Sequence, residues 1–411
     1  MSKLTSFKLS EIYEANRRLD GIIHHTPLNR SATFSVGSGN EIFLKKENEQ
    51  KTGSFKVRGA ANKIAKLVAE KDCKVMVAAS AGNHAQGVAY ASRQNNIPAI
   101  IVMPETTPIA KINATKGYGA EVILRGDSYD DAYEAAIEIA KERGGTFVHP
   151  FDDMDVIAGQ GTIAHEILKR QAKVDAIIVP AGGGGLLAGV AATTKELMPD
   201  VQVFGVQAVG ADAIAQSFSN GKRTCLDKLD TIADGIAVKK PGELTVELIN
   251  KYADGVATVT DEEIAATIMD LMEREKTMVE PAGATSLAFA VSEKFGLRGK
   301  KVACILSGGN VDISLIKNII EQGLVLRKRK INFSVALPNK VGALVPLSKL
   351  IADNNANISR MDFDASMPKQ QVLHLTCDVG GEEHSGKLMA AIHEHGYKIL
   401  ENGRSNDREY V

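Results

Sequence analysis

The stretch Ala176-Ile177-Ile178-Val179-Pro180-Ala181-Gly182-Gly183-Gly184-Gly185-Leu186 joins a short apolar run to four consecutive glycines and the start of a longer segment. The run Ala176–Val179 shows no polar alternation, which is typical of a parallel strand buried on both faces. The segment Leu186–Leu197 is predicted to be a helix. A strand followed by a tight turn and a helix is the repeating unit of α/β proteins, and this unit sets the expected fold class.

The same alternation of strand and helix continues on both sides of this stretch. Tyr129–Arg143 and Glu262–Arg274 have the apolar spacing of amphipathic helices, and Thr260 with Glu263 predicts a capping box at the start of the second. Five more apolar runs are predicted to be buried strands: Val75–Ala79, Ala99–Met103, Glu121–Leu124, Val203–Val206 and Val302–Leu306. Together they predict right-handed βαβ units and a doubly wound α/β architecture.

The pattern changes after about residue 325. Ile331–Leu337 alternates with period two and is predicted to be a strand, followed by a helix over Val341–Asn355. Two strands, a helix and a last strand are expected after it: Ile358–Ala365, Gln371–Asp378, Ser385–His395 and Tyr397–Leu400. The resulting order β-α-β-β-α-β is a split βαβ unit and predicts a second domain.

We therefore divide the chain into a large domain over residues 1–324, a linker over residues 325–330 and a small domain over residues 331–411. The linker Val325–Lys330 is basic. A solvated connection is the simpler interpretation of this charge, and an anion site is the alternative.

Composition narrows the class of protein. The 411 residues include 49 Lys and Arg against 50 Asp and Glu, a net charge of −1, which argues against nucleic-acid binding. The N-terminal residues have no apolar segment typical of a secretory signal, and no apolar run is long enough to span a bilayer. The four cysteines are scattered, so neither a zinc cluster nor a disulfide framework is indicated. We expect a cytoplasmic protein without a membrane partner.

The glycine run is a candidate anion site. Its backbone can turn tightly and direct several N–H groups at one phosphate, and the following helix adds positive potential. The run lacks the pattern GxxxxGK[ST], so a nucleotide triphosphate site is not supported. A strand-to-helix turn without a ligand remains the alternative.

Three further segments carry candidate functional groups. Lys56, in Lys51-Thr52-Gly53-Ser54-Phe55-Lys56, lies at a predicted helix start beside an aromatic residue, where a lowered pKa would make it a nucleophilic amine able to form a Schiff base. An exposed structural lysine is the alternative. Ser80-Ala81-Gly82-Asn83-His84 follows a strand and could bind a carboxylate or phenolate, or act only in helix capping. Ser307-Gly308-Gly309-Asn310 follows the strand ending at Leu306, and Ser307 could bond a ring nitrogen.

Taken together, SFKxRGA, SAGNHAQG, GGGGL and SGGN resemble, in order and spacing, the pyridoxal-phosphate-dependent threonine/serine dehydratases of the tryptophan-synthase-β-like fold type. The resemblance covers roughly residues 5–320. It implies a fold-type-II catalytic domain of two α/β subdomains. It also implies pyridoxal 5′-phosphate as cofactor and β-elimination of L-threonine to 2-oxobutanoate and ammonia. A catabolic threonine or serine dehydratase is the nearest alternative, and an amino-acid sensor that has lost catalysis is another.

The resemblance also implies site residues. Lys56 would bind the cofactor covalently next to Phe55, and Asn83 would contact its ring oxygen. Ser307 would face the ring nitrogen. The amides of Gly182, Gly183, Gly184, Gly185 and Leu186 would hold the phosphate, and the substrate carboxylate would lie against Ser80, Ala81, Gly82, Asn83 and His84. Gly235 and Glu280 lie in stretches that resemble walls of the same site. For Glu280, a helix-start acid is the alternative.

Two departures from relatives sharpen these expectations. Serine racemases of this fold carry a serine where this chain has Ala81, so an acid–base group on the second face of the substrate α-carbon is missing and racemisation should be weak. Those relatives also bind a divalent cation through acids, where this chain has Gln207 and Ala213. Since such cations prefer carboxylates, we expect no metal there.

The small domain resembles an ACT domain. Asn339, Val341, Gly342 and Leu344 lie at its first strand-to-helix turn, where such domains bind amino acids. The resemblance implies feedback control by a branched-chain amino acid in isoleucine biosynthesis, and a homotetramer or homodimer. A purely structural, dimerising role is the alternative.

Overall fold

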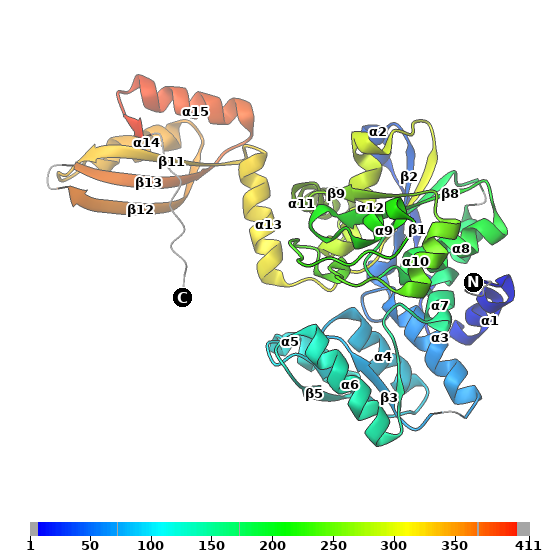
Figure 1. The fold of residues 1–411 in the computed structure, drawn as a ribbon. Coiled ribbons are helices and arrows are strands. Elements are labelled where there is room, and N and C mark those ends of the chain that lie inside the picture. Colours follow the sequence, from blue (N-terminus) through cyan, green and yellow to red (C-terminus); the bar gives the residue numbers. More distant parts are fainter. Residues whose placement is uncertain (1–6, 72, 172, 368–369, 401–411) are drawn as a thin grey trace. The chain divides into compact units, whose positions relative to one another are not determined.

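A computed structural model describes residues 7–71, 73–171, 173–367 and 370–400 (Figure 1). The outer ends of the two predicted domains, residues 1–6 and 401–411, lie outside these ranges. The chain forms two compact units, Met1–Val311 and Asp312–Val411. The boundary expected at residues 324/325 falls inside the second unit.

The first unit is built around a six-stranded sheet with the strand order β1-β2-β10-β7-β8-β9. Its strands are β1 (Leu28–Ser31), β2 (Glu41–Lys46), β7 (Ala176–Pro180), β8 (Gln202–Ala208), β9 (Gly255–Val259) and β10 (Lys301–Leu306). Neighbouring strands are parallel except for β1, which pairs antiparallel with β2. The carboxyl ends of β7 and β10 therefore lie at one edge of the sheet.

The same unit contains a smaller, fully parallel sheet with the order β5-β4-β3-β6. Its strands are β3 (Met76–Ala79), β4 (Ala99–Met103), β5 (Glu121–Leu124) and β6 (Thr146–Phe147). Met76 and Ala78 point into one apolar cluster, whereas Val77 and Ala79 point into another on the opposite face. Because helices cover both faces, the doubly wound α/β architecture is confirmed.

Helices pack around both sheets of the first unit. They are α1 (Leu9–Leu19), α2 (Ala32–Ser38), α3 (Lys56–Ala69), α4 (Asn83–Gln94), α5 (Ile109–Gly117), α6 (Tyr129–Arg143), α7 (Met154–Arg170), α8 (Gly185–Leu197), α9 (Ala213–Asn220), α10 (Glu243–Tyr252), α11 (Asp261–Asp270) and α12 (Pro281–Val291). The capping box predicted at Thr260 is present. The helix expected to reach Arg274 instead gives way to a π-helical turn over Leu271–Glu275.

The second unit begins with α13 (Ile313–Leu326) and continues as β11 (Lys330–Pro338), α14 (Leu344–Asp353), β12 (Asn357–Met367), β13 (Gln370–Asp378), α15 (Glu382–Glu394) and β14 (Ile399–Leu400). Its antiparallel sheet has the order β12-β13-β11-β14. Apolar residues of α14 and α15 pack with those of β11 and β13 in one core. The predicted β-α-β-β-α-β order is confirmed. α14 begins three residues later than expected, after Gly342 with φ of 80°.

Sequence periodicity missed several strands and misjudged one. β1, β2, β6 and β9 were not predicted, and β5 is not buried on both faces, since Glu121 and Leu124 are exposed. β2 was missed because it contains charged residues. Lys45, in β2, is fully buried and paired with Glu166.

Candidate active site

The glycine run forms the turn between β7 and α8. Gly184 has φ of 98°, a left-handed conformation that favours glycine, and α8 begins at Gly185. A Cβ on Gly183 would collide with the ring of Phe151, and one on Gly185 would lie 2.9 Å from the Phe151 backbone. The first N–H groups of a helix have no acceptor within it, so this turn presents donors to an anion.

Lys56 lies at the start of α3, close to the segment that contains Phe151. Its Nζ donates to the carbonyl oxygen of Pro150 at 3.1 Å, one residue before Phe151. Burial lowers the pKa of Lys56 to about 8, although Glu280 opposes the shift. A larger share of this amine is therefore uncharged at neutral pH than for an ordinary lysine, as a nucleophile or base requires.

Asn83, the first residue of α4, faces Glu280 at the start of α12. Its Nδ2 lies 2.9 Å from Oε1 and 3.1 Å from Oε2 of Glu280. Burial raises the pKa of Glu280 to about 7, whereas the bond from Asn83 and the charge of Lys56 lower it. With this pKa, Glu280 can take up or release a proton near neutral pH. Its side chain does so inside the site, since the residue is only 8% exposed.

Ser307 follows β10 and lies beside the Lys56 segment. The backbone N–H of Phe55 donates to the carbonyl oxygen of Ser307 at 3.0 Å, and Ser54 pairs with Gly308 in an isolated antiparallel bridge. A Cβ on Gly308 would collide with the carboxyl group of Glu280. Ser307 and Glu280 therefore line neighbouring parts of one space.

Contacts of the glycine turn with the segment around Gly235 complete a ring of segments around Lys56. A Cβ on Gly182 would lie 2.9 Å from Cα of Ile236, and one on Gly235 would lie 3.4 Å from Oε1 of Glu280. The structure thus brings together the predicted residues Lys56, Asn83, Gly182–Gly185, Gly235, Glu280 and Ser307, which come from distant parts of the chain.

The remaining predicted substrate residues continue the turn before α4. The Ser80 hydroxyl accepts a bond from the Gly82 N–H at 3.1 Å, and Ala81 is half-buried beside it. His84 points into the protein, where its Nε2 lies 2.8 Å from the Val148 carbonyl oxygen. Burial lowers the pKa of His84 to about 3, so its ring is neutral. A neutral ring supplies no charge for pairing with a carboxylate.

Several residues that line this space were not predicted. Pro150 and Phe151 support Lys56 and the glycine turn, and Asn310 donates to Asn83. Asn310 belongs to the SGGN motif, which could have indicated it. Pro150 and Phe151 follow the short strand β6, which the sequence analysis missed.

The predicted effector residues lie in the second unit. Asn339, Val341 and Gly342 lie in the turn between β11 and α14, where Val341 is fully exposed, and Leu344 is the first residue of α14.

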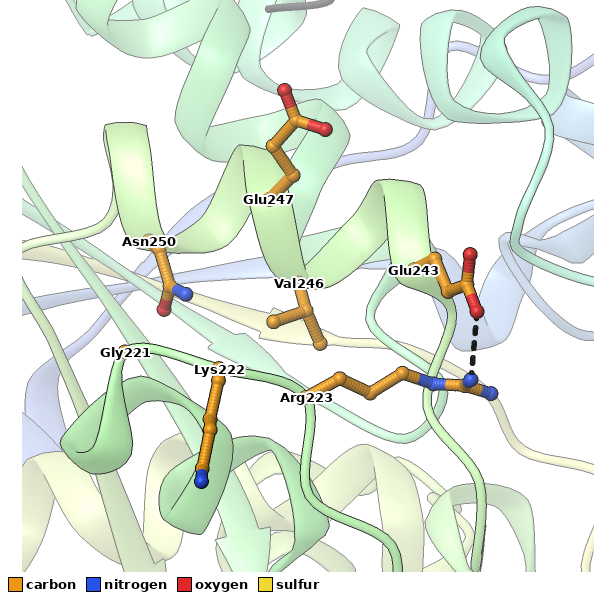
Figure 2. Close-up of a pocket in the computed structure, with 7 residues that line it drawn as sticks. All are labelled: Gly221, Lys222, Arg223, Glu243, Val246, Glu247 and Asn250. Atoms are coloured by element: carbon orange, nitrogen blue, oxygen red, sulfur yellow. Dashed lines mark hydrogen bonds and ion pairs between the residues drawn. The ribbon is translucent and has the colours of Figure 1, made fainter. Parts of the chain in front are cut away.

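A separate surface hollow of about 440 Å³ lies between α10 and the segment after α9 (Figure 2). Arg223 crosses it and bonds Glu243 at 3.1 Å. The hollow is lined by Gly221, Lys222, Arg223, Glu243, Val246, Glu247 and Asn250, and none of the predicted site residues is among them.

The residues of the site fit pyridoxal phosphate. The glycine turn suits a phosphate group, and the amine of Lys56 suits an aldehyde. The buried hydroxyls of Thr52 and Ser54, on the segment before Lys56, have no hydrogen-bond partner within the described protein. Buried polar groups of this kind are expected where a polar ligand supplies the missing bonds.

Comparisons with known proteins agree with this assignment. The family model "Pyridoxal-phosphate dependent enzyme" matches residues 19–308. An L-threonine ammonia-lyase of Thermotoga maritima is 44% identical over 395 residues, which is 95% of this chain and 98% of that protein. A catabolic L-threonine dehydratase of Staphylococcus aureus is 47% identical, covering 77% of this chain and 92% of that protein. The structure of maize serine racemase aligns with a TM-score of 0.74 at 35% identity, covering 79% of this chain and 100% of that one. Within the described residues, no helix has the length and apolar character needed to cross a membrane.

Proposed function

Because the chain belongs to the family of pyridoxal-phosphate dependent enzymes, we propose that it is an L-threonine ammonia-lyase, which converts L-threonine into 2-oxobutanoate and ammonia. The observation that carries the proposal is the ring of segments around Lys56, with its amine of lowered pKa and the glycine turn beside it. The match to a relative of that name extends over 95% of the chain.

Each segment of the site has a proposed part in holding the cofactor. The amides of Gly182–Leu186 would bind the phosphate, Lys56 the aldehyde carbon, Asn83 the ring oxygen and Ser307 the ring nitrogen, with Phe55 beside them. When bound, pyridoxal phosphate supplies an electron-poor ring that accepts the charge left when an amino acid loses its α-proton. A serine at the ring nitrogen, unlike a carboxylate, does not favour a protonated ring.

The protein's own groups would position the substrate and move its protons. The turn Ser80–His84 would orient the carboxylate through backbone N–H groups, and Nζ of Lys56 would remove the α-proton. The β-hydroxyl then leaves as water, which requires one proton. The released 2-aminobut-2-enoate takes up water and breaks down to 2-oxobutanoate and ammonia.

Racemisation is the competing reaction within the fold, since a serine racemase is structurally similar. This chain has Ala81 next to Ser80, and a methyl group cannot deliver a proton to the opposite face of the α-carbon. We therefore propose that racemase activity is weak.

We propose that the second unit is an ACT-type regulatory domain. Its β-α-β-β-α-β order and the turn at Asn339–Leu344 support an effector site for a branched-chain amino acid. We also propose that the protein assembles into a homo-oligomer and that it acts in isoleucine biosynthesis in the cytoplasm. At Gln207 we propose that no metal is bound. In the structure, the side chain of Gln207 accepts a bond from the Ala215 N–H at 2.9 Å.

The test is the initial rate of 2-oxo acid formation against L-threonine concentration, with and without L-isoleucine. Turnover with a sigmoidal curve that isoleucine shifts to higher threonine would support both the activity and its control. Turnover that isoleucine leaves unchanged would favour the catabolic alternative or a different effector. Absence of 2-oxo acid from either threonine or serine, together with a colourless protein, would favour an amino-acid sensor without catalysis.

A further inference from the structure

Asn310 is the first member of a chain of side-chain amides that ends at Glu280. Its Nδ2 donates to the carbonyl oxygen of Thr52 at 2.7 Å and to Oδ1 of Asn83 at 2.8 Å. Nδ2 of Asn83 in turn donates to both carboxyl oxygens of Glu280. Three segments that are far apart in sequence are linked in this way.

The direction of these hydrogen bonds is set at Thr52. A main-chain carbonyl can only accept, so the amide nitrogen of Asn310, and not its oxygen, must face Thr52. The second hydrogen of that nitrogen then requires an acceptor from Asn83. This leaves Asn83 with its NH₂ group toward Glu280.

Backbone contacts hold Asn310 in the position from which it bonds Thr52 and Asn83. The Gly309 N–H donates to the carbonyl oxygen of Gly53 at 2.9 Å, which ties the turn after β10 to the segment before Lys56. Gly53 has φ of 71°, and a Cβ there would collide with the Asn310 amide. The absence of a Cβ at Gly53 therefore leaves room for the Asn310 side chain.

We propose that Asn310 is a positioning residue, which locks the amide of Asn83 with its NH₂ group toward Glu280 and so favours the ionised form of Glu280. The inference rests on the proposed function, because the same NH₂ group is the donor that the cofactor's ring oxygen would require. Glu280 also faces Lys56 from α3, Lys111 from α5 and Asp234 from the turn before α10. These charges are unchanged in Asn310→Ala and Asn310→Gln, whereas Asn310→Asp adds a negative charge that by itself also disfavours the ionised form of Glu280.

Without Asn310, the Asn83 amide is free to turn its oxygen toward Glu280. A carboxylate is disfavoured next to an amide oxygen, whereas a protonated carboxyl group can donate to it. The titration of Glu280 should therefore move to higher pH. In Asn310→Asp the carboxylate accepts from Asn83 and holds the turned orientation, which should move the titration further.

The experiment follows the protonated carboxyl band of Glu280 by infrared difference spectroscopy of the holoenzyme across pH. Glu280→Gln identifies the band, and the visible absorbance of the bound cofactor is a second readout. We expect the midpoint in Asn310→Ala to rise by about 0.5–1 pH unit and that in Asn310→Asp to rise more. Asn310→Gln keeps an NH₂ group and should titrate closer to the wild type than Asn310→Ala.

Asn48→Ala is the matched control. Asn48 packs against Gly309 and donates to Thr277 Oγ1 at 2.9 Å and to the Met278 carbonyl oxygen at 3.0 Å, yet it does not bond Asn83. Its loss should leave the midpoint unchanged. Equal shifts in Asn48→Ala and Asn310→Ala, or no shift in either Asn310→Ala or Asn310→Asp, would overturn the inference.

If Asn310→Ala does not fold, the comparison of Asn310→Gln with Asn310→Leu decides, because both are uncharged and only Gln keeps an NH₂ group. Equal midpoints in those two variants would also overturn the inference. Failure of the proposed function is a separate result. A protein that shows the shifts but forms no 2-oxo acid from threonine would support the positioning role of Asn310 and contradict the proposed activity.

Discussion

Single residues in this protein owe their chemistry to partners that lie far away in the sequence. Lys56 has a pKa of about 8 because its amine is buried, and Glu280 has a pKa of about 7 for the same reason. The two groups interact through space, so each moderates the shift of the other. The pKa values of Lys56 and Glu280 near neutral pH are therefore a property of the folded site.

Lys56→Ala should remove the visible absorbance of the bound cofactor and nearly all turnover, because it removes the amine that lies beside Pro150 and the glycine turn. Lys66→Ala is the control on the same helix. Lys66 lies outside the site and forms an ion pair with Asp155, with 2.8 Å between Nζ and Oδ1. Absorption spectra and threonine turnover of the two purified variants provide the measurement. Normal turnover in Lys56→Ala would refute the assignment of this lysine.

Arg58 shows how strongly one residue can depend on burial. It is fully buried, and its guanidinium bonds Glu47 at 2.8 Å and Glu166 at 2.7 Å. Burial alone would raise the pKa of Glu166, but Arg58 and Lys45 lower it to about 2. The pKa of this carboxyl is thus depressed on folding, and its contribution to stability is present above about pH 4.5 and lost as pH falls through about 2.

Arg58→Met should lower the free energy of unfolding at pH 7 by about 3–5 kcal/mol, because it leaves the buried carboxylates of Glu47 and Glu166 to share the single positive charge of Lys45. The loss of stability on acidification from pH 4.5 should also be smaller in the variant. Urea unfolding measured at several pH values tests both effects. Lys294→Met breaks a partly exposed ion pair with Glu263 and should cost at most about 1 kcal/mol. Similar losses in the two variants would contradict the buried-network explanation.

At the scale of elements, turns at the carboxyl ends of parallel strands build the site. The turns after β3, β7 and β10 were all expected from the sequence, because each glycine-rich segment follows an apolar run. Close packing explains several of the glycines. Phe151 fills the space beside Gly183 and Gly185, so a larger residue would displace either the ring or the turn.

Gly183→Ala should weaken cofactor binding by about tenfold or more, because the added methyl group collides with Phe151 and shifts the amides of the turn. Gly37→Ala is the control, since a Cβ there meets nothing within 4 Å. The dissociation constant of pyridoxal phosphate from each apoprotein, followed by absorbance, measures the effect. Equal affinities would show that the turn tolerates the methyl group and that its close packing is not required.

At the scale of the whole molecule, the chain combines two units of different architecture. The first carries the complete ring of site residues within Met1–Val311, and the second has its own apolar core. The structure groups α13 with the second unit, so the unit that contains the site ends before that helix. This division predicts that turnover and effector response can be separated.

A chain that ends at Val311, before α13, should form 2-oxo acid from threonine and lose any response to the effector, because it lacks the turn at Asn339–Leu344. The control is the full chain, assayed with and without L-isoleucine under the same conditions. Retained inhibition in the shortened chain would place the effector site in the first unit. If the shortened chain is insoluble, Val341→Asp in the full chain tests the same turn, because Val341 is fully exposed.

The sequence alone determined the α/β class, the order of the second domain, the glycine turn and the candidacy of Lys56. Each of these depends on local features: the period of apolar residues, the conformational freedom of glycine and the order of motifs along the chain. Only the tertiary structure decided that β1 pairs antiparallel, that charged Lys45 is buried in β2, and that Thr52, Asn310, Asn83 and Glu280 form one chain of hydrogen bonds. The physical reason is that these features arise when residues that are not neighbours in the sequence meet: the β1–β2 partners lie 11 to 17 positions apart, and the partners of Lys45 and of the hydrogen-bond chain lie more than a hundred apart. Burial, pairing and the direction of a hydrogen bond are then set by the partner and not by the local sequence.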